Sequence, residues 1–354
     1  MKQKNSSWIF IGIIVVQLVV LGAWANYQII KHIGGRVLGS QKSQQAFSLI
    51  DLLRLRRHLK PTPTPGPSVT PSPSPSPIPI PVSGGGLPFG PFYPSESSYS
   101  NPFSGGFVDL SKMSVDSAKS FLDTAKSKNM KLIVTIAGSR NDFQNSDGSF
   151  SISKHNDQLK RFASLDLNSY VRDGVVIGEL LLDEPQDPSN WNDQTVPFED
   201  IEAAAANSKA LWSGLPAGVG SNPDWLAGNS AGWRNLDFVL APFTAKRLCS
   251  YRPGSNCSPS ISDWNSSLVT SAKNAGLKLG LSINVLDGGD LSGGTVSAAQ
   301  LTEWGTAIVN ESYACAFTMW KNDASGYFNQ ADIAAVIKNL ADIAKTKSPP
   351  SCGR

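Results

Sequence analysis

The sequence is poor in histidine, cysteine and charged residues. It contains three histidines and four cysteines in 354 residues, and 17% of its residues are charged. Because His155 is the only histidine after the first 60 residues, a zinc centre of several histidines is excluded there and a Ser-His-Asp triad is disfavoured. The chain also lacks a GxxxxGK[ST] loop and paired CxxC motifs, which disfavours P-loop nucleotide hydrolysis and a cysteine zinc site. We therefore expect no cofactor and no metal.

Basic residues are concentrated at the N-terminus. Residues 1–60 contain nine Lys or Arg and a single acid, Asp51, whereas residues 87–354 contain 22 Lys or Arg and 27 Asp or Glu. The larger part is thus acidic and has no basic stripe. Since nucleic-acid binding depends on clustered Lys and Arg that neutralise phosphates, we expect no nucleic-acid partner.

One long apolar run lies near the N-terminus. Residues 8–25 are apolar except for Gln17 and follow two lysines, and a helix of that length crosses a hydrocarbon layer of about 30 Å. We predict an N-terminal transmembrane anchor or signal segment over residues 1–30. The Ala23-Trp24-Ala25 step also fits a signal-peptidase site, so the segment is either a single-pass anchor or is cleaved to give a secreted protein. Charges on its two flanks balance, so they do not fix its orientation.

A basic segment and a proline-rich linker follow. Residues 31–60 form a basic juxtamembrane segment, in which residues 44–60 have the spacing of an amphipathic helix, either bound to headgroups, paired with another copy, or simply solvated. Ten of the 21 residues from Pro61 to Pro81 are proline, which favours an extended stalk of about 65 Å. Glycines close this linker, residues 61–86. Only residues 87–354 are able to build a sizeable core.

Apolar runs alternate with helical patterns after residue 87, which is typical of βα units. We predict eight strands, at 88–94, 105–110, 131–138, 175–184, 217–223, 236–243, 277–286 and 315–321. We predict helices at 114–128, 198–212, 262–275, 298–311 and 329–345. This α/β pattern predicts a (β/α)8 TIM barrel domain over residues 87–354. The first and fifth units are the weakest, because no full-length helix follows their strands. A doubly wound sheet is the alternative, but no glycine fingerprint follows the first strand.

The four cysteines suggest an oxidising compartment. Cys249 and Cys257 bracket a short polar loop that a disulfide would close, and Cys315 and Cys352 are a candidate second pair. The alternative is four unrelated thiols. Together with the stalk, the cysteines favour a barrel that lies outside the cytoplasm.

Strand four ends in two adjacent acids, Asp183 and Glu184, followed by Pro185. Two such acids would cost several kcal/mol if they were buried as unpaired charges. We interpret them as working groups at the C-terminal mouth, where barrels of this kind place their active sites. The alternative is that one of them caps a helix or pairs with a loop arginine. Glu179 alternates with Asp183 in the same strand, which points it into the barrel, with pairing to the helix layer as the alternative.

This Asp-Glu-Pro step resembles the end of strand four in (β/α)8 glycoside hydrolases, although it identifies no specific family. The resemblance implies that Glu184 is the general acid/base. An adjacent Asp-Glu pair is more particularly similar to the families that hydrolyse N-acetylhexosaminides by substrate assistance, which implies that Asp183 orients the acetamido group.

Strand seven departs from that pattern, because it lacks the nucleophilic Glu found there in many retaining members. Asp287 is the candidate second carboxylate, with Asp323 or Asp224 as substitutes. Substrate assistance, inversion and the absence of catalysis all stay open, since the choice depends on the distance between the carboxyl groups.

Aromatic and polar residues at the predicted strand ends suit a sugar, because a pyranose ring stacks on an aromatic face and its hydroxyls need polar partners. The candidate stacking residues, each with core packing as its alternative, are Trp320, Tyr93, Trp191 and Trp225. The candidate polar partners are Arg140, Asn141, Asn222, Asn284 and Asp323. Lys246 after strand six would suit a Schiff base, a less favoured hypothesis. The sequence thus predicts an extracytoplasmic glycoside hydrolase-like protein, or a carbohydrate-binding scaffold that does not hydrolyse its ligand.

Overall fold

The computed structural model describes residues 85–94, 102–246, 260–289, 293–320 and 326–354. The chain divides into two compact units, Met1–Ser76 and Pro77–Arg354, and the described residues all belong to the second. Within those ranges no helix has the length and apolar character needed to cross a membrane. The predicted anchor, the juxtamembrane segment and most of the linker lie outside the described residues, as do Cys249, Cys257 and Asp323.

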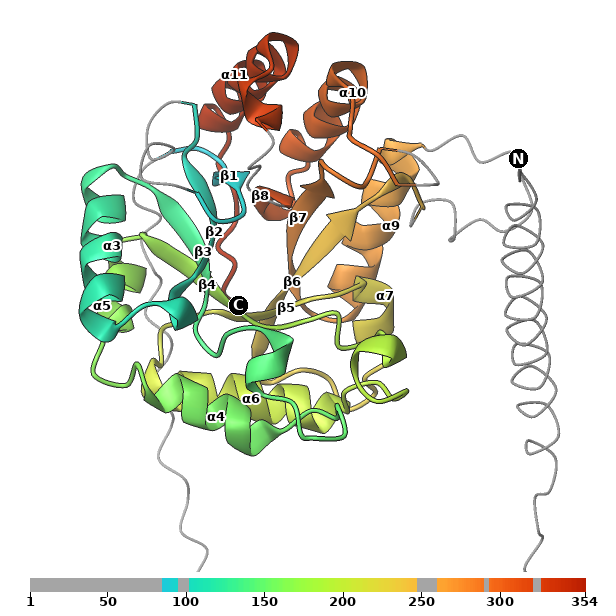
Figure 1. Cartoon of the computed structure of the whole chain (residues 1–354). Helices are drawn as coiled ribbons and strands as arrows, with labels where there is room; N and C mark the ends of the chain where they lie inside the picture. The colour runs from blue at the N-terminus through green and yellow to red at the C-terminus, as the bar shows by residue number, and fades with distance from the viewer. Residues whose placement is uncertain (1–84, 95–101, 247–259, 290–292, 321–325) are drawn as a thin grey trace, which may run out of the picture. The chain divides into compact units, whose positions relative to one another are not determined.

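Eight parallel strands form one sheet in the order β1-β8-β7-β6-β5-β4-β3-β2. A parallel bridge between Phe92 and Phe107 joins the two end strands, so that the sheet closes into a barrel (Figure 1). This is the predicted (β/α)8 barrel. The strands are β1 Phe89–Pro91, β2 Gly105–Asp109, β3 Lys131–Thr135, β4 Val176–Asp183, β5 Ala217–Gly220, β6 Leu236–Phe243, β7 Lys278–Asn284 and β8 Ala314–Trp320.

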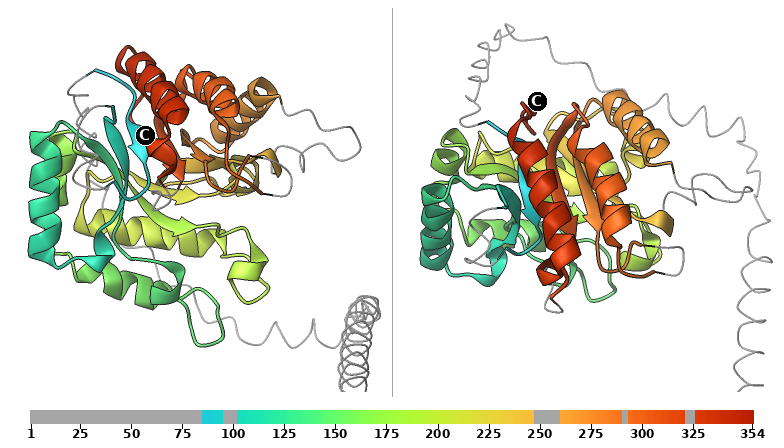
Figure 2. Two further views of the ribbon diagram at one scale, coloured as in Figure 1. Left: turned by 45° about the horizontal axis from the view of Figure 1, so that its top comes forward. Right: turned by 90° about the horizontal axis from the view of Figure 1, so that it is seen from above.

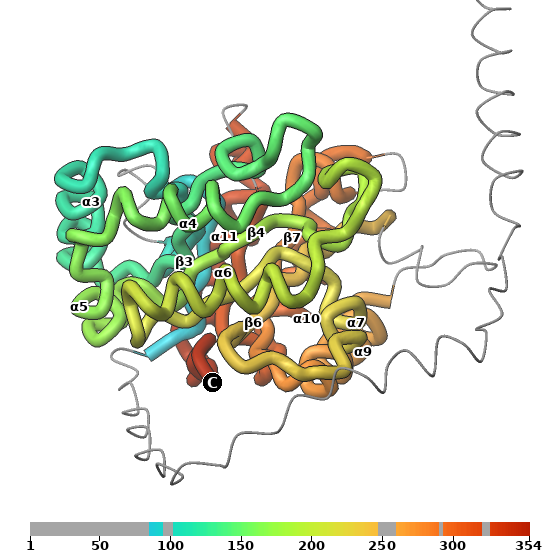
Figure 3. Tube along the Cα trace, turned by 90° about the horizontal axis from the view of Figure 1, so that it is seen from below, coloured from blue at the N-terminus to red at the C-terminus, as the bar shows by residue number. Residues whose placement is uncertain are grey.

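Helices surround the strands on the outside, with α10 and α11 side by side (Figures 1 and 2) and α4 beside α6 (Figure 3). Several helices begin where the sequence supplies a cap, since the Ser114, Asp166 and Ser297 side chains each accept a hydrogen bond from the backbone N–H three residues later. The helices are α3 Val115–Ser127, α4 Ile152–Lys160, α5 Leu167–Arg172, α6 Phe198–Leu211, α7 Pro223–Leu226, α9 Ile261–Asn274, α10 Ala298–Val309 and α11 Ala331–Lys345.

Several predicted element boundaries need correction. The first strand is only Phe89–Pro91, because prolines at its flanks lack the N–H that a ladder needs. The fifth strand ends at Gly220 and is followed by the four-residue helix α7, which agrees with the expected weakness of the fifth unit. The helices α4 and α5, between strands three and four, were not predicted.

Buried side chains form two clusters. The larger one lies between the strands and the helices and includes residues of both. The smaller one contains no helical residue and fills the inside of the barrel. Its members, with the partly buried side chains packed on it, are Phe92, Phe107, Ile133, Ile177, Leu180, Phe238, Leu240, Cys315, Ala316, Trp320 and Cys352. The interior is therefore a packed core rather than a channel.

Strand β4 contains a bulge that changes which side chains face inward. Leu180 pairs with Gly218 of β5 and Leu182 pairs with the next residue, Val219, so that Leu181 is the extra residue. Leu180 belongs to the inner cluster, whereas Leu181 and Leu182 both belong to the outer one. One inserted residue shifts the alternation of a strand. As a consequence Asp183 faces the mouth of the barrel.

The prediction that Glu179 shares its direction with Asp183 is therefore wrong. Glu179 is fully buried and accepts a hydrogen bond from the hydroxyl of Ser208 on α6, so it faces the helix layer. Burial raises the pKa of Glu179 to about 7, although the hydrogen bond from Ser208 acts in the opposite direction.

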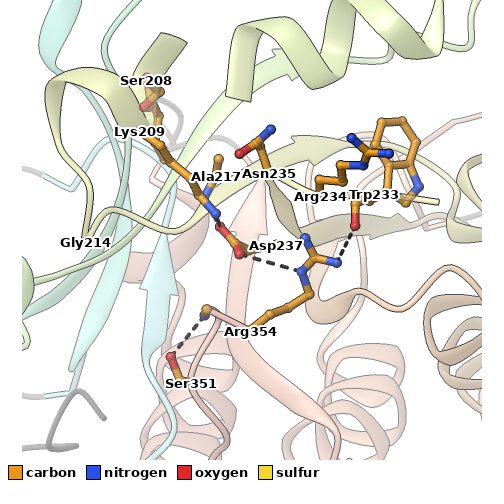
Figure 4. Close-up of polar contacts among 12 residues, drawn as sticks. Ser208, Lys209, Gly214, Ala217, Trp233, Arg234, Asn235, Asp237, Ser351 and Arg354 are labelled. Carbon is orange, nitrogen blue, oxygen red and sulfur yellow. Dashed lines mark hydrogen bonds and ion pairs between the residues drawn. The ribbon is translucent and has the colours of Figure 1, made fainter. Parts of the chain in front are cut away.

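The N-terminal ends of the strands form a closed base. Asp237, at the start of β6, is 4% exposed and accepts hydrogen bonds from the backbone N–H of Ala217 at 2.8 Å and from Lys209 at 2.7 Å. Arg354 lies 3.7 Å from the same carboxylate and donates to the carbonyl of Trp233 at 2.8 Å (Figure 4). These contacts fasten the C-terminal segment across the base.

A disulfide joins Cys315, in the second position of β8, to Cys352 in that segment. The predicted Cys315–Cys352 pairing is confirmed. Both half-cystines are buried in the inner cluster, so the bond links the C-terminal segment directly to the barrel interior.

Candidate functional site

A cavity of about 430 Å³ opens at the C-terminal ends of β1, β2, β3, β4 and β8. This is the end of the barrel where the sequence placed the site. Its polar wall contains Asp109, Thr135, Ser139, Arg140, Asn141 and Asp183. Its aromatic wall contains Phe92, Tyr93, Phe107, Phe143, Trp191 and Trp320. The volume falls in the range of pockets that bind small organic molecules.

Six of the predicted site residues line this cavity. Asp183, Arg140, Asn141, Tyr93 and Trp320 lie on four different strand ends, far apart in the sequence, and all contribute to its wall. Trp191, which was also a stacking candidate, lines the cavity but is only 2% exposed. Its ring stacks on Phe143 at a centroid distance of 6.2 Å, so its main role is to pack the loop after β4.

The aromatic rings form one group. Phe92 and Phe107 lie 4.5 Å apart between ring centroids, and Tyr93 meets Phe107 edge-on at 5.7 Å. Tyr93 is 50% exposed, whereas Phe92 and Phe107 are buried. The exposed ring thus rests on two fixed ones, an arrangement that offers a rigid apolar surface to a ligand.

Glu184 stands beside the cavity. Its backbone adopts φ 51°, a left-handed conformation that costs a residue with a side chain about 1–2 kcal/mol. Its carboxylate accepts a hydrogen bond from the amide of Asn190 at 3.2 Å, and its carbonyl accepts one from the indole of Trp191 at 3.0 Å. Glu184 is half-buried and is not among the residues that line the cavity. The surrounding loop therefore holds a strained residue in place, as is common at functional sites.

Asp109 is a site residue that the sequence analysis missed. It ends β2, lines the cavity, and accepts a hydrogen bond from the backbone N–H of Ser111 at 2.9 Å. Burial raises the pKa of Tyr93, and the negative charges of Asp109 and Asp183 raise it further. Both carboxylates thus act on the same phenol. The signal was present in the sequence, because the apolar run of strand two stops at this acid.

Arg140 begins a short 3-10 helix, η4 Arg140–Asp142, after β3. Its Nη1 donates to the side-chain oxygen of Asn190 at 2.6 Å, and its guanidinium lies 5.6 Å from the centre of the Trp191 ring. Since Asn190 also donates to Glu184, its amide links the predicted acid to the predicted cation.

Other predicted residues lie outside this cavity. Asn284 uses its side-chain oxygen to accept from the backbone N–H groups of Leu286 and Asp287, so it shapes the turn after β7. Trp225 packs on Phe198 at a centroid distance of 4.6 Å, which makes it a packing residue. Asn222, Asp287 and Asp224 are also absent from the wall.

His155 does not line the cavity. It is fully buried on α4 beside Phe143 and Phe150, at ring-centroid distances of 5.3 and 6.0 Å. Burial lowers the pKa of His155 to about 4, so the ring is neutral at physiological pH. Within the described ranges no three Asp, Glu, His or Cys side chains are placed to hold a metal ion.

No protein-family model matches the chain, and no curated protein matches it either. Its likeness is to solved barrel structures. An endo-1,4-beta-mannanase from Rhizomucor miehei has a TM-score of 0.50 and 13% identity, covering 74% of this chain and 96% of that one. Xylanase 10B from Thermotoga maritima has a TM-score of 0.47 and 12% identity, covering 73% and 95%. A D-psicose 3-epimerase has a TM-score of 0.43 and 16% identity, covering 73% and 96%.

Glycoside hydrolases are therefore among the structural neighbours, and the resemblance seen in the sequence is confirmed for the fold. At these identities the likeness shows the parallel eight-stranded barrel alone, without a specific family. What the site can do must come from its own residues. Two carboxylates, one cation and an aromatic surface in one cavity suit a polyhydroxylated ring, whose hydroxyls need acceptors and donors and whose apolar face needs an aromatic partner.

Proposed function

We propose that the protein is a membrane-tethered glycosidase whose barrel lies outside the cytoplasm and acts on a polysaccharide or other glycan. The observation that carries the proposal is the cavity at the barrel mouth, where Asp109 and Asp183 face the same space as the rings of Tyr93 and Trp320. Carboxylates of this kind supply the proton transfers of glycoside hydrolysis.

In the proposed reaction Glu184 protonates the oxygen of the leaving sugar while Asp183 orients the substrate. The second carboxylate, for which the sequence suggested Asp287, is better assigned to Asp109, because Asp109 shares the cavity with Asp183. A water molecule activated by Asp109 attacks the anomeric carbon as the glycosidic bond breaks. The strand β3 separates β2 from β4, so their backbones lie about 10 Å apart. We propose inversion, in which carboxyl groups about 6.5–9.5 Å apart leave room for the water.

The location outside the cytoplasm is part of the proposal. Residues 8–25 have the length and apolarity of a membrane span, and the proline-rich stalk separates them from the barrel. The Cys315–Cys352 disulfide supports the same location, because structural disulfides persist in oxidising compartments.

The test is hydrolysis by the full-length protein in detergent micelles. Neutral and acidic oligosaccharides are incubated with it, and new reducing ends are detected by mass spectrometry. We expect Glu184→Gln and Asp183→Asn to lower the rate by about 10²-fold or more, while Glu303→Gln, an exposed position on α10, leaves it unchanged. Full activity in Glu184→Gln would refute the assignment of the acid.

A second candidate function is carbohydrate binding without hydrolysis. It is favoured by one observation, namely that Glu184 is bonded to Asn190 and does not line the cavity. Binding of an oligosaccharide that is recovered with unchanged mass, from every member of the panel, would establish it in place of the glycosidase.

A further inference from the structure

Within the part of the chain that the structure describes, Arg140 forms no ion pair with a carboxylate. Of the described residues that line the cavity, it alone is positively charged. Its polar contact is with the neutral amide of Asn190, and its other contact is with the face of Trp191. It makes no ion pair within the described part of the chain, although Asp109 and Asp183 line the same cavity. The base of the barrel differs, since Arg354 there lies beside Asp237.

Most hydrogen-bond donors of Arg140 are left for a ligand or water. A guanidinium has five N–H donors, and one of them is used by Asn190. Nε is buried and has no partner among the described residues. Nη2 donates to no partner among the described residues and is not one of the buried unpaired atoms, so Nη2 and the second N–H of Nη1 are left for a ligand or water. A guanidinium binds the two oxygens of a carboxylate through N–H groups on two of its nitrogens.

The guanidinium is also held rigidly. Asn190, which accepts from it, is itself fixed, because its side chain donates to Glu184 and its carbonyl accepts from Gln144 at 2.6 Å. Trp191, which covers its face, donates to the carbonyl of Glu184. Both the edge and the face of the guanidinium are thus held before any ligand arrives. A preorganised cation of this kind loses little entropy on binding and therefore favours a specific anion.

The chemistry of the cavity points to a singly charged anion on a sugar. Asp109 and Asp183 repel a doubly charged phosphate more strongly than a monoanion, so the single cation of the cavity favours a carboxylate over a phosphate. The aromatic wall then accepts the apolar face of the ring. We propose that Arg140 binds the carboxylate of a uronic acid, so that the glycan taken by this barrel is acidic. This inference rests on the proposed function for the sugar and adds the charge of that sugar.

The experiment compares the affinity for an acidic oligosaccharide with the affinity for its uncharged, carboxyl-reduced form. Full-length protein in detergent micelles is titrated with tetrasaccharides of galacturonic, glucuronic and mannuronic acid, and with the carboxyl-reduced form of each. We expect at least one acid to bind about tenfold or more tightly than its reduced form, as a charge-assisted bidentate contact implies. Arg140→Gln should remove this preference. Arg172→Gln is the matched control, because Arg172 is an exposed arginine on α5, and it should retain the preference.

The outcomes separate this inference from the proposed function. Equal binding of all acidic and reduced forms, or an undiminished preference in folded Arg140→Gln, overturns the uronic acid site. If Arg140→Gln does not fold, as judged by near-ultraviolet circular dichroism, Arg140→Met takes its place with the same expectation. Cleavage of neutral glycans alone would support the glycosidase and sink the acidic substrate. A preference for the acidic form that depends on Arg140, without any cleavage, would support the uronic acid site and contradict the glycosidase.

Discussion

The two ends of the barrel treat their polar groups in opposite ways. At the base the buried carboxylate of Asp237 has a backbone N–H, a lysine and an arginine around it, and a disulfide closes the same region. At the mouth Arg140 contacts the neutral amide of Asn190 and no carboxylate among the described residues, and Tyr93 and Glu184 adopt left-handed backbone conformations. The polar groups of the base pair with one another and stabilise the fold, whereas Arg140 at the mouth keeps N–H donors for a ligand.

The largest effect is expected at the base, from loss of the disulfide. The two cysteines are 37 residues apart, and opening a loop of that length costs about 4 kcal/mol in the chain-entropy view. Urea unfolding of Cys315→Ser/Cys352→Ser should show this loss. At 25 °C ligand binding by the folded variant should be unchanged, and weaker binding would show that base and mouth are coupled.

Glu179, in β4 between the two ends, should make the free energy of unfolding change with pH by about 3 kcal/mol. The folded-state pKa of Glu179 is raised from 4.5 to about 7, so the folded state holds the proton more tightly than the unfolded state. The free energy of unfolding should therefore fall as pH rises from about 4.5 to 7, and stay low above it. Glu179→Gln should lack this fall. Parallel pH curves for the two proteins would contradict the assignment.

Asp237→Asn should destabilise the base by about 2 kcal/mol, because Lys209 and Arg354 then lose their charged partner. Asp193→Asn is the matched change in an exposed loop, and it should stay within about 0.5 kcal/mol of the parent. Thermal unfolding of the two variants under one set of conditions makes the measurement. Equal melting temperatures of the two variants would show that Asp237 stabilises the fold no more than an aspartate in an exposed loop.

At the mouth, glycine should be better than alanine at position 184 by about 1 kcal/mol, because only glycine adopts φ 51° without strain. At Glu303, within α10, the order should reverse, since glycine weakens a helix interior. Denaturant unfolding of all four variants tests both signs. If alanine proves better at both positions, Glu184 is not strained.

The smallest change in stability is expected from Asp183→Asn, within about 0.5 kcal/mol, because Asp183 is exposed. The same variant should lose the proposed turnover. A large destabilisation would show that Asp183, like Asp237 at the base, stabilises the fold.

Strand and helix positions were largely predictable from the sequence. The sixth strand was predicted at its observed bounds, 236–243, because an apolar run broken only by Asp237 is bounded there by Asn235 and Thr244. By contrast α4 was missed, since its buried face consists of His155 and Leu159, and a histidine does not count as apolar in such a pattern. The cavity residues were predictable only from their positions just after predicted strands, which is why six of them were found.

The direction of Glu179 could not be predicted. Alternation alone pointed it inward with Asp183, but the extra residue Leu181 reverses the pattern between them. Whether a strand contains a bulge depends on its pairing with the neighbouring strand, and no local pattern in β4 records that pairing. For the same reason the sequence did not bring Asp109 and Asp183 together, because their proximity is set by the order of the strands.

Among the described residues, a single β-bridge between Phe92 and Phe107 closes the barrel between its first two strands. Near it the backbone of Tyr93 donates to Phe107 and that of Ser104 donates to Phe89, whereas each other neighbouring pair of strands shares a ladder of three or more residue pairs. Local opening begins where backbone hydrogen bonds are fewest. Because Tyr93 follows β1 at this bridge and lines the cavity, we expect local opening there to act first on the aromatic side of the cavity.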